Sequence, residues 1–163
     1  MNDLEIVKMR LEQIFDSDQK AIKDFKAGTL TLDGWKKINE DNLKCVRDLL
    51  CQGIFPFRDT FSEKAYNAFF LAVQHSENID LMKQVADYIF KADVVQVNKT
   101  HYAYLIDRIR IFEGKPQLYG TQFKKEGNVV TFLDIEDPTN IDIRRAELGM
   151  ESFEEYKKKT ESY

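Results

Sequence analysis

The chain has 163 residues, which fits one compact domain better than two full ones. Hydrophobic residues make up 43% and aromatic residues 12% of it, so there is enough apolar material for a core, and intrinsic disorder is excluded for most of the chain. Lys and Arg total 24 against 28 Asp and Glu, and this net charge of −4 argues against nonspecific binding to nucleic acid.

Helical spacing of apolar residues predicts five helices in the first two thirds of the chain. They are expected at residues 4–25, 33–50, 63–75, 79–90 and 102–112. Ser62 can cap the third of them, which is apolar nearly all round and is therefore expected in the middle of the domain. The apolar loop at residues 54–57 contains Pro56, which discourages a helix, and should tuck against the core.

After Gly114 the apolar residues no longer follow helical spacing. Residues 117–124 and 129–135 predict a β-hairpin, because two β-prone runs flank a turn that contains Gly127 and Asn128. Two short helices should follow, at residues 142–148 and 152–159. The predicted fold class is thus mainly α, a bundle of five or more helices with a β-hairpin near the C-terminal third.

Two parts of this bundle are distinguished by sequence. Residues 1–53 are expected to form an N-terminal helical pair within the same domain, and residues 54–163 a helical core with the hairpin. Cys45 and Cys51 lie about 9 Å apart along a predicted helix, so we expect two free thiols and no structural metal site. Acidic residues near the N-terminus and the short apolar runs indicate a soluble, cytoplasmic protein.

His75 follows Gln74 at the end of the most apolar predicted helix. A histidine held against apolar walls can act as a general base or as a donor to a ligand. It can equally be a helix-terminal residue whose ring satisfies an exposed carbonyl.

Asp107 and Arg108 are turned about 100° apart on the fifth predicted helix, so they cannot both face the core. Arg108 shares a stripe with His101 and Tyr104, and its guanidinium could bind a carboxylate or phosphate there. The alternative is a solvated face in which Asp107 pairs with Arg110.

Residues 117–123 hold the densest cluster of uncharged hydrogen-bonding side chains in the chain. Gly120 within a predicted strand indicates a bulge, or the close approach of another backbone or a ligand. Residues 119–122 are therefore the best site candidate from pattern, and an ordinary edge hairpin with a bulge is the alternative.

Arg144 and Arg145 lie on the short helix after the hairpin. Adjacent arginines diverge by one helical step, so at most one readily joins an inward site. An anion clamp and a structural salt bridge to Asp134 or Asp137 both remain open.

These segments together carry a resemblance to a known family. The resemblance lies in Gln74-His75, in Ala-Tyr-Leu-Ile-Asp-Arg-Ile at residues 103–109, in Glu-Gly-Lys-Pro-Gln-Leu-Tyr-Gly-Thr-Gln-Phe at residues 113–123, and in Arg144-Arg145 before Leu148-Gly149. Over roughly residues 54–156 the chain resembles a bacterial family catalogued only as a domain of unknown function, number 6624. It departs at Phe55-Pro56, where related chains tend to have Trp-Pro. The resemblance implies a small, mostly helical bacterial protein. It also implies that four groups of polar residues converge on one place: Gln74-His75, Asp107-Arg108, residues 119–122 and Arg144-Arg145.

We therefore expect a polar pocket that binds a small anionic ligand and, in an enzymatic version, hydrolyses it or transfers a group without a metal or other cofactor. The candidate catalytic residues are His75 and Asp107, and the candidate substrate-binding residues are Gln74, Arg108, Gln117, Tyr119, Thr121, Gln122, Arg144 and Arg145.

The alternative is a protein-interaction module of antitoxin-like or immunity-like type, without catalysis, whose acidic helices cover a basic partner. A third possibility is a satisfied structural network with no ligand. Nucleic acid and membrane are not expected as partners, and the oligomeric state is open.

Overall fold

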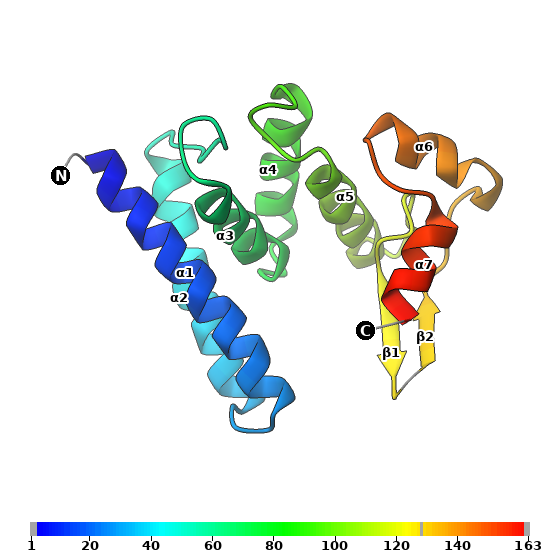
Figure 1. The fold of residues 1–163 in the computed structure, drawn as a ribbon, viewed down its shortest axis with the longest axis horizontal. Helices are drawn as coiled ribbons and strands as arrows, with labels where there is room; N and C mark the ends of the chain where they lie inside the picture. The colour runs from blue at the N-terminus through cyan, green and yellow to red at the C-terminus, as the bar shows by residue number, and fades with distance from the viewer. Residues whose placement is uncertain (1–2, 128, 162–163) are drawn as a thin grey trace. The chain divides into compact units, whose positions relative to one another are not determined.

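The computed structural model describes residues 3–127 and 129–161 (Figure 1). These residues form seven α-helices, one short 3-10 helix and one two-stranded antiparallel sheet, which confirms the predicted mainly helical fold with a hairpin in the C-terminal third. The helices are α1 (Asp3–Lys26), α2 (Leu32–Cys51), α3 (Glu63–Gln74), α4 (Ile79–Lys91), α5 (Thr100–Phe112), α6 (Ile141–Glu147) and α7 (Phe153–Glu161). The remaining elements are β1 (Phe123–Glu126), β2 (Val129–Phe132) and the 3-10 helix η1 (Pro138–Asn140).

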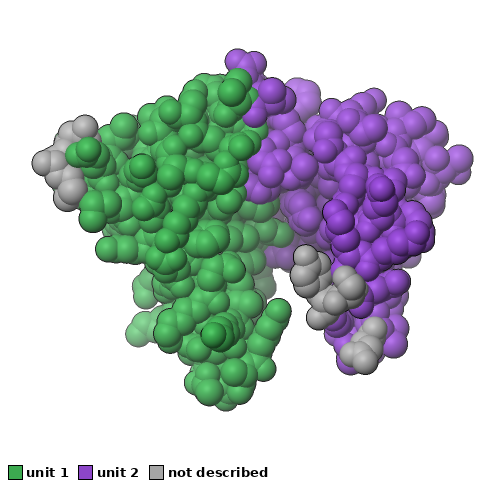
Figure 2. Space-filling view, viewed as in Figure 1, with its two compact units in different colours: residues 1–78, 95–97 green, residues 79–94, 98–163 purple. Residues whose placement is uncertain are grey.

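The chain divides into two compact units, coloured separately in Figure 2. The first contains the described residues up to Asn78 together with residues 95–97. The second contains residues 79–94 and the described residues from Asn98 onward. The predicted division at residue 53 stays a prediction.

Helix α3 forms the centre of the first unit, and both α1 and α2 pack against it. It begins after Ser62, whose hydroxyl accepts a hydrogen bond from the backbone N–H of Ala65 at 3.1 Å. Its buried residues, which cover most of the helix circumference as predicted, are Ala65, Tyr66, Ala68, Phe69, Phe70, Ala72 and Val73. The preceding apolar loop reaches this core, because the ring of Phe55 lies 5.1 Å from that of Phe69.

The second unit is built from the packed pair α4 and α5, followed by the hairpin, α6 and α7. Strand β1 pairs with β2 in a register that places Phe123 opposite Phe132. Both strands are shorter than predicted, and Gln117 contributes only an isolated parallel bridge to Ile135. Of the predicted turn residues, Asn128 lies outside the described residues.

None of the helices in the described part of the chain combines the length and the hydropathy needed to cross a bilayer. Both cysteines are free thiols, with Cys45 buried and Cys51 exposed.

Candidate functional site

Asp107 lies in the middle of α5 and is fully buried. Its Oδ1 accepts hydrogen bonds from the backbone N–H groups of Leu118 and Tyr119, at 2.7 and 3.0 Å. Its Oδ2 accepts from the backbone N–H and from the hydroxyl of Thr121, each at 2.9 Å. A carboxylate is tolerated in the interior when such donors replace water. The four donors tie residues 118–121 to α5, and these N–H groups bond to a side chain in place of a neighbouring strand. The prediction of a strand over residues 117–122 is therefore wrong.

Gln117 lies at the start of the same loop and bonds to Gln122 at its end; it is also fully buried. Its amide nitrogen donates to the carbonyls of Gln122 and Leu133, at 3.0 and 2.8 Å, and its amide oxygen accepts from the N–H of Gln122 at 2.9 Å. The Gln117 side chain thus makes hydrogen bonds of the kind that the backbone of a neighbouring strand would make. It links Gln122 to Leu133, which follows β2. In this position Gln117 supports the loop, and its role in binding a substrate stays a prediction.

Arg144 and Arg145, from α6, bind two successive carbonyl groups of this loop. The Nε of Arg144 donates to the carbonyl of Leu118 at 2.9 Å, and Nη1 of Arg145 donates to the carbonyl of Tyr119 at 2.6 Å. The peptide groups of these two residues are thus held through their N–H groups by Asp107 and through their carbonyls by the arginines. Both arginines reach the loop, so the expectation that at most one of them would join an inward site is wrong: each bonds to a different carbonyl.

Arg144 also holds the chain just before η1. Its Nη2 donates to the carbonyls of Glu136 and Asp137, at 2.7 and 3.0 Å, and its Nη1 lies 3.7 Å from the carboxylate of Asp137. The sequence left open an anion clamp and a salt bridge to Asp134 or Asp137, and the structure contains the contact with Asp137.

Arg145 is 1% exposed and lies between aromatic rings of α7. Its guanidinium carbon is 4.9 Å from the ring centre of Tyr156 and 5.8 Å from that of Phe153, and its Nε donates to the carbonyl of Glu151 at 2.8 Å. Burial lowers the pKa of Arg145, but an arginine keeps its charge at neutral pH. The side chain therefore carries a buried positive charge that joins the loop to α7.

Gly120 allows this packing. Its φ of +69° lies in the left-handed region, and a Cβ there would stand 2.5 Å from the ring of Phe153. Only glycine fits both conditions. The close approach expected at this residue is therefore made by an aromatic ring of the same chain.

Four polar side chains border this buried network and remain half-buried: Tyr104, Arg108, Gln122 and Tyr156, which we call the α5 rim. The Nε and Nη2 of Arg108 point at the amide oxygen of Gln122, at 3.4 and 3.3 Å. The amide nitrogen of Gln122 donates to the hydroxyl of Thr121 at 3.0 Å. The hydroxyl of Tyr156 lies 3.5 Å from that of Tyr104 and donates to the carbonyl of Thr121 at 3.3 Å. Burial, followed by the bond from Tyr104, raises the pKa of Tyr156.

Tyr119 turns its ring toward Tyr102 on α5, with 6.4 Å between the ring centres. Burial is the main cause that raises the pKa of Tyr119 to about 12. Tyr119 is thus a neutral phenol at physiological pH and can offer a hydrogen bond but no charge.

Gln74 and His75 lie at the end of α3, in the first unit. The Nδ1 of His75 is 3.4 Å from Oδ1 of Asp18 on α1, and the side chains of these two residues are 18% and 4% exposed. The ring of Trp35 lies 6.1 Å from the imidazole. A buried carboxylate therefore faces one ring nitrogen of His75, and the imidazole keeps some contact with solvent.

Sequence analysis missed Asp18, although its position carries a signal. Asp18 continues the buried stripe of α1 that also contains Leu11, Ile14 and Ala21, at helical spacing. An acidic residue in register with apolar residues indicates a buried carboxylate that needs a partner. His75 as that partner was not predictable, because the two residues are far apart in sequence.

The structure gathers eight of the ten predicted site residues in the second unit, where hydrogen bonds join them directly or through the loop. These are Asp107, Arg108, Gln117, Tyr119, Thr121, Gln122, Arg144 and Arg145. Gln74 and His75 belong to the first unit, so the expectation that all ten share one hollow stays a prediction. Within residues 3–127 and 129–161, no group of three His, Cys, Asp or Glu side chains is placed to hold a metal ion.

Comparison with known protein families gives a match over most of the chain. A family model described as a family of unknown function, DUF6624, matches residues 23–163. The match is wider than the resemblance seen over residues 54–156, and it includes the whole of α2. No curated protein and no solved structure matches the chain.

Proposed function

Because the chain belongs to the DUF6624 family, whose function is unknown, we propose a function from the geometry of its second unit: it binds a small anionic molecule at the α5 rim. Arg108 supplies the positive charge, and Gln122 orients the ligand through neutral hydrogen bonds. We further propose that the protein is bacterial and cytoplasmic.

The observation that carries this proposal is the pairing of Arg108 with Gln122. The guanidinium meets the oxygen of a neutral amide, at 3.3 and 3.4 Å, so this contact orients the guanidinium beside Gln122. Both distances exceed the usual length of about 2.9–3.0 Å for an N–H···O bond, and a ligand oxygen that came closer would make a stronger bond. The half-buried position of Arg108 leaves part of the side chain within reach of solvent.

The buried network supports the proposal by fixing the α5 rim in advance. Gln122 ends a loop held by Asp107 and Gln117, and its amide bonds to Thr121, which Asp107 also binds. A binding group that is already held loses less conformational entropy when the ligand arrives. In this proposal Asp107 is a positioning residue for the site, and its expected catalytic role stays a prediction.

The experiment is a thermal-shift screen of the full chain with inorganic phosphate, sugar phosphates, nucleotides and carboxylates, followed by titration calorimetry of the strongest hit. A ligand at a hundredfold excess over its dissociation constant should stabilise the protein by about 2.7 kcal/mol. Arg108→Gln should weaken binding about tenfold or more, and Arg108→Lys should weaken it less, because the charge remains while the planar fork is lost.

Lys124→Gln is the matched control, since it removes one exposed positive charge from β1 of the same unit. If it weakens binding as much as Arg108→Gln, the ligand responds only to net charge and the α5 rim is not the site. If no anion shifts the melting temperature and a pull-down recovers one basic protein, the interaction module replaces this proposal.

A second candidate function, general-base catalysis by His75, is favoured by the position of Asp18. The Nδ1 of His75 lies 3.4 Å from the carboxylate of Asp18, so Nε2 is the ring nitrogen left to accept a proton from a substrate or from water. The reaction would be hydrolysis or group transfer. In a screen of phosphate and carboxylate esters, His75→Gln should abolish turnover and Asp18→Asn should lower kcat and change its pH profile. Turnover that survives His75→Gln would exclude this role.

A further inference from the structure

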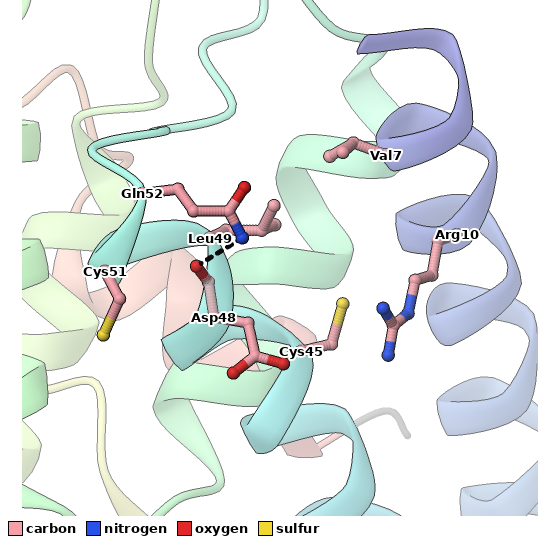
Figure 3. A pocket seen from close by; sticks show the side chains of 7 residues that line it. All are labelled: Val7, Arg10, Cys45, Asp48, Leu49, Cys51 and Gln52. Atoms are coloured by element: carbon pink, nitrogen blue, oxygen red, sulfur yellow. Dashed lines mark hydrogen bonds between the residues drawn. The ribbon is translucent and has the colours of Figure 1, made fainter. Parts of the chain in front are cut away.

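A cavity of about 320 Å³ lies between α1 and α2 in the first unit, at the lower end of the range of about 300–1,000 Å³ for small-molecule sites. Figure 3 shows Arg10 extending from α1 toward the part of α2 that carries Cys45 and Asp48. Val7 and Leu49 supply apolar wall. A cavity at this end of the range is large enough for a ligand of amino-acid size.

The cavity is lined by one positive and one negative side chain that do not pair with each other. Neither the Arg10 guanidinium nor the Asp48 carboxylate has a hydrogen bond or ion pair with any residue in the described part of the chain. Both side chains therefore keep their hydrogen-bonding capacity beside the same cavity.

We propose that this cavity binds a zwitterion of amino-acid size, with its carboxylate on Arg10, its ammonium group on Asp48 and an apolar side chain against Val7 and Leu49. A simple anion drawn to Arg10 would be repelled by Asp48, and a simple cation drawn to Asp48 would be repelled by Arg10. A zwitterion places each of its charges beside the opposite charge. The guanidinium can hold the carboxylate through two parallel hydrogen bonds.

Cys45 gives the cavity a neutral wall between the two charges. Its side chain is almost fully buried, and this burial raises the pKa of the thiol, so it stays protonated at neutral pH. A thiol packs as a small apolar group and adds no competing charge. The site thus combines two charges with an apolar surface, which matches an amino acid with an aliphatic side chain.

This site is independent of the anion site proposed at the α5 rim. It lies in the other unit and uses other residues. Val7 and Arg10 also precede residue 23, where the match to the family model begins. Failure of one proposal leaves the other standing.

The test uses the full chain labelled with 15N, titrated with leucine and with two analogues that each lack one charge, 4-methylpentanoate and 3-methylbutylamine. Leucine at millimolar concentration should give saturable shifts of the amide resonances of Arg10, Cys45 and Asp48. Each analogue should bind about tenfold more weakly or worse, because it leaves one protein charge without a partner.

Arg10→Gln and Asp48→Asn should each weaken leucine binding about tenfold or more. Both residues are exposed, so the variants are expected to fold. Arg47→Gln and Asp41→Asn are matched controls, because they remove the same charges from exposed positions of α2 that do not line the cavity. The controls should leave the affinity unchanged.

Three results would each overturn the proposal. Leucine could produce no saturable shifts at the cavity residues. Either singly charged analogue could bind as tightly as leucine, or the control variants could weaken binding as much as the cavity variants.

Discussion

Leu118 and Tyr119 show how charged side chains can replace the partners of a strand. Their N–H groups donate to Asp107 on α5, and their carbonyls accept from Arg144 and Arg145 on α6. Hydrogen bonds to charged groups contribute about 1.5–3 kcal/mol each, against about 1 kcal/mol for neutral pairs. A loop outside the sheet can therefore be held as firmly as a paired strand.

Replacement of Asp107 tests this account directly. Asp107→Asn keeps the shape of the side chain but leaves one acceptor oxygen where four donors now converge, and the new NH2 group must face some of them. We expect a loss of about 3 kcal/mol in the free energy of unfolding, measured by urea denaturation. Asp87→Asn, which breaks an exposed pair between Asp87 and Lys91, should cost less than about 0.5 kcal/mol. Equal losses would contradict a structural role for Asp107.

Gly120 gives a second prediction with a close control. Gly120 and Gly114 both have positive φ, +69° and +72°, but only at Gly120 would a Cβ meet other atoms within 4 Å. Gly114→Ala should therefore cost about 1 kcal/mol for the backbone alone. Gly120→Ala should cost about 2 kcal/mol more, because the ring of Phe153 must also move. If urea titrations give the same loss for both variants, Phe153 is not what requires glycine.

At the scale of whole elements, the helices were predictable because each shows its buried face as a repeat in the sequence. Helix α3 is the clearest case, since its apolar run and its Ser62 cap are both local signals. The start of β1 was not predictable, because residues 118–121 bond to Asp107, a side chain 11 to 14 positions away. The candidate site shows the same difference between local features, which were predictable, and long-range contacts, which were not. Its residue types were visible in the sequence, but the sequence did not indicate which of them bind one another.

The junction of α4 and α5 gives a pH-dependent prediction. Glu113, just after α5, pairs with Lys115 at 2.7 Å and with Lys83 of α4 at 2.6 Å. Hydrogen bonds from Lys115 and Lys83 lower the pKa of Glu113 from 4.5 to about 2. Because the carboxyl binds its proton more weakly in the folded chain, its contribution to stability is complete above pH 4.5 and is lost as the pH falls toward 2.

Glu113→Gln should therefore be less stable than the wild type at pH 7, and the difference should disappear by about pH 2. Urea titrations at a series of pH values measure it. Glu40→Gln is the matched control, because it removes the same charge from an exposed position of α2. A difference that stays constant from pH 7 to pH 2 would mean that the charge of Glu113 is not responsible.

At the scale of the whole molecule, the two units are not two successive stretches of the chain. The chain leaves the first unit after Asn78, returns to it at residues 95–97 and leaves it again. The return is anchored, because the N–H of Arg58 donates to the carbonyl of Gln96 at 2.8 Å and Val97 is 1% exposed. The core of the first unit therefore includes residues that follow α4 in the sequence.

Val97→Ala tests whether this return stabilises the first unit. Trp35 is the only tryptophan of the chain and lies in α2, so its fluorescence reports on the unfolding of the first unit. Removing two methyl groups from the buried Val97 should lower the free energy of unfolding reported by Trp35 by about 1–2 kcal/mol. Val95→Ala is the control, because Val95 belongs to the same short segment but is 74% exposed, and it should change that energy by less than about 0.5 kcal/mol. If both variants leave the Trp35 transition unchanged, residues 95–97 lie against the first unit without stabilising it, and the core of that unit ends with α3.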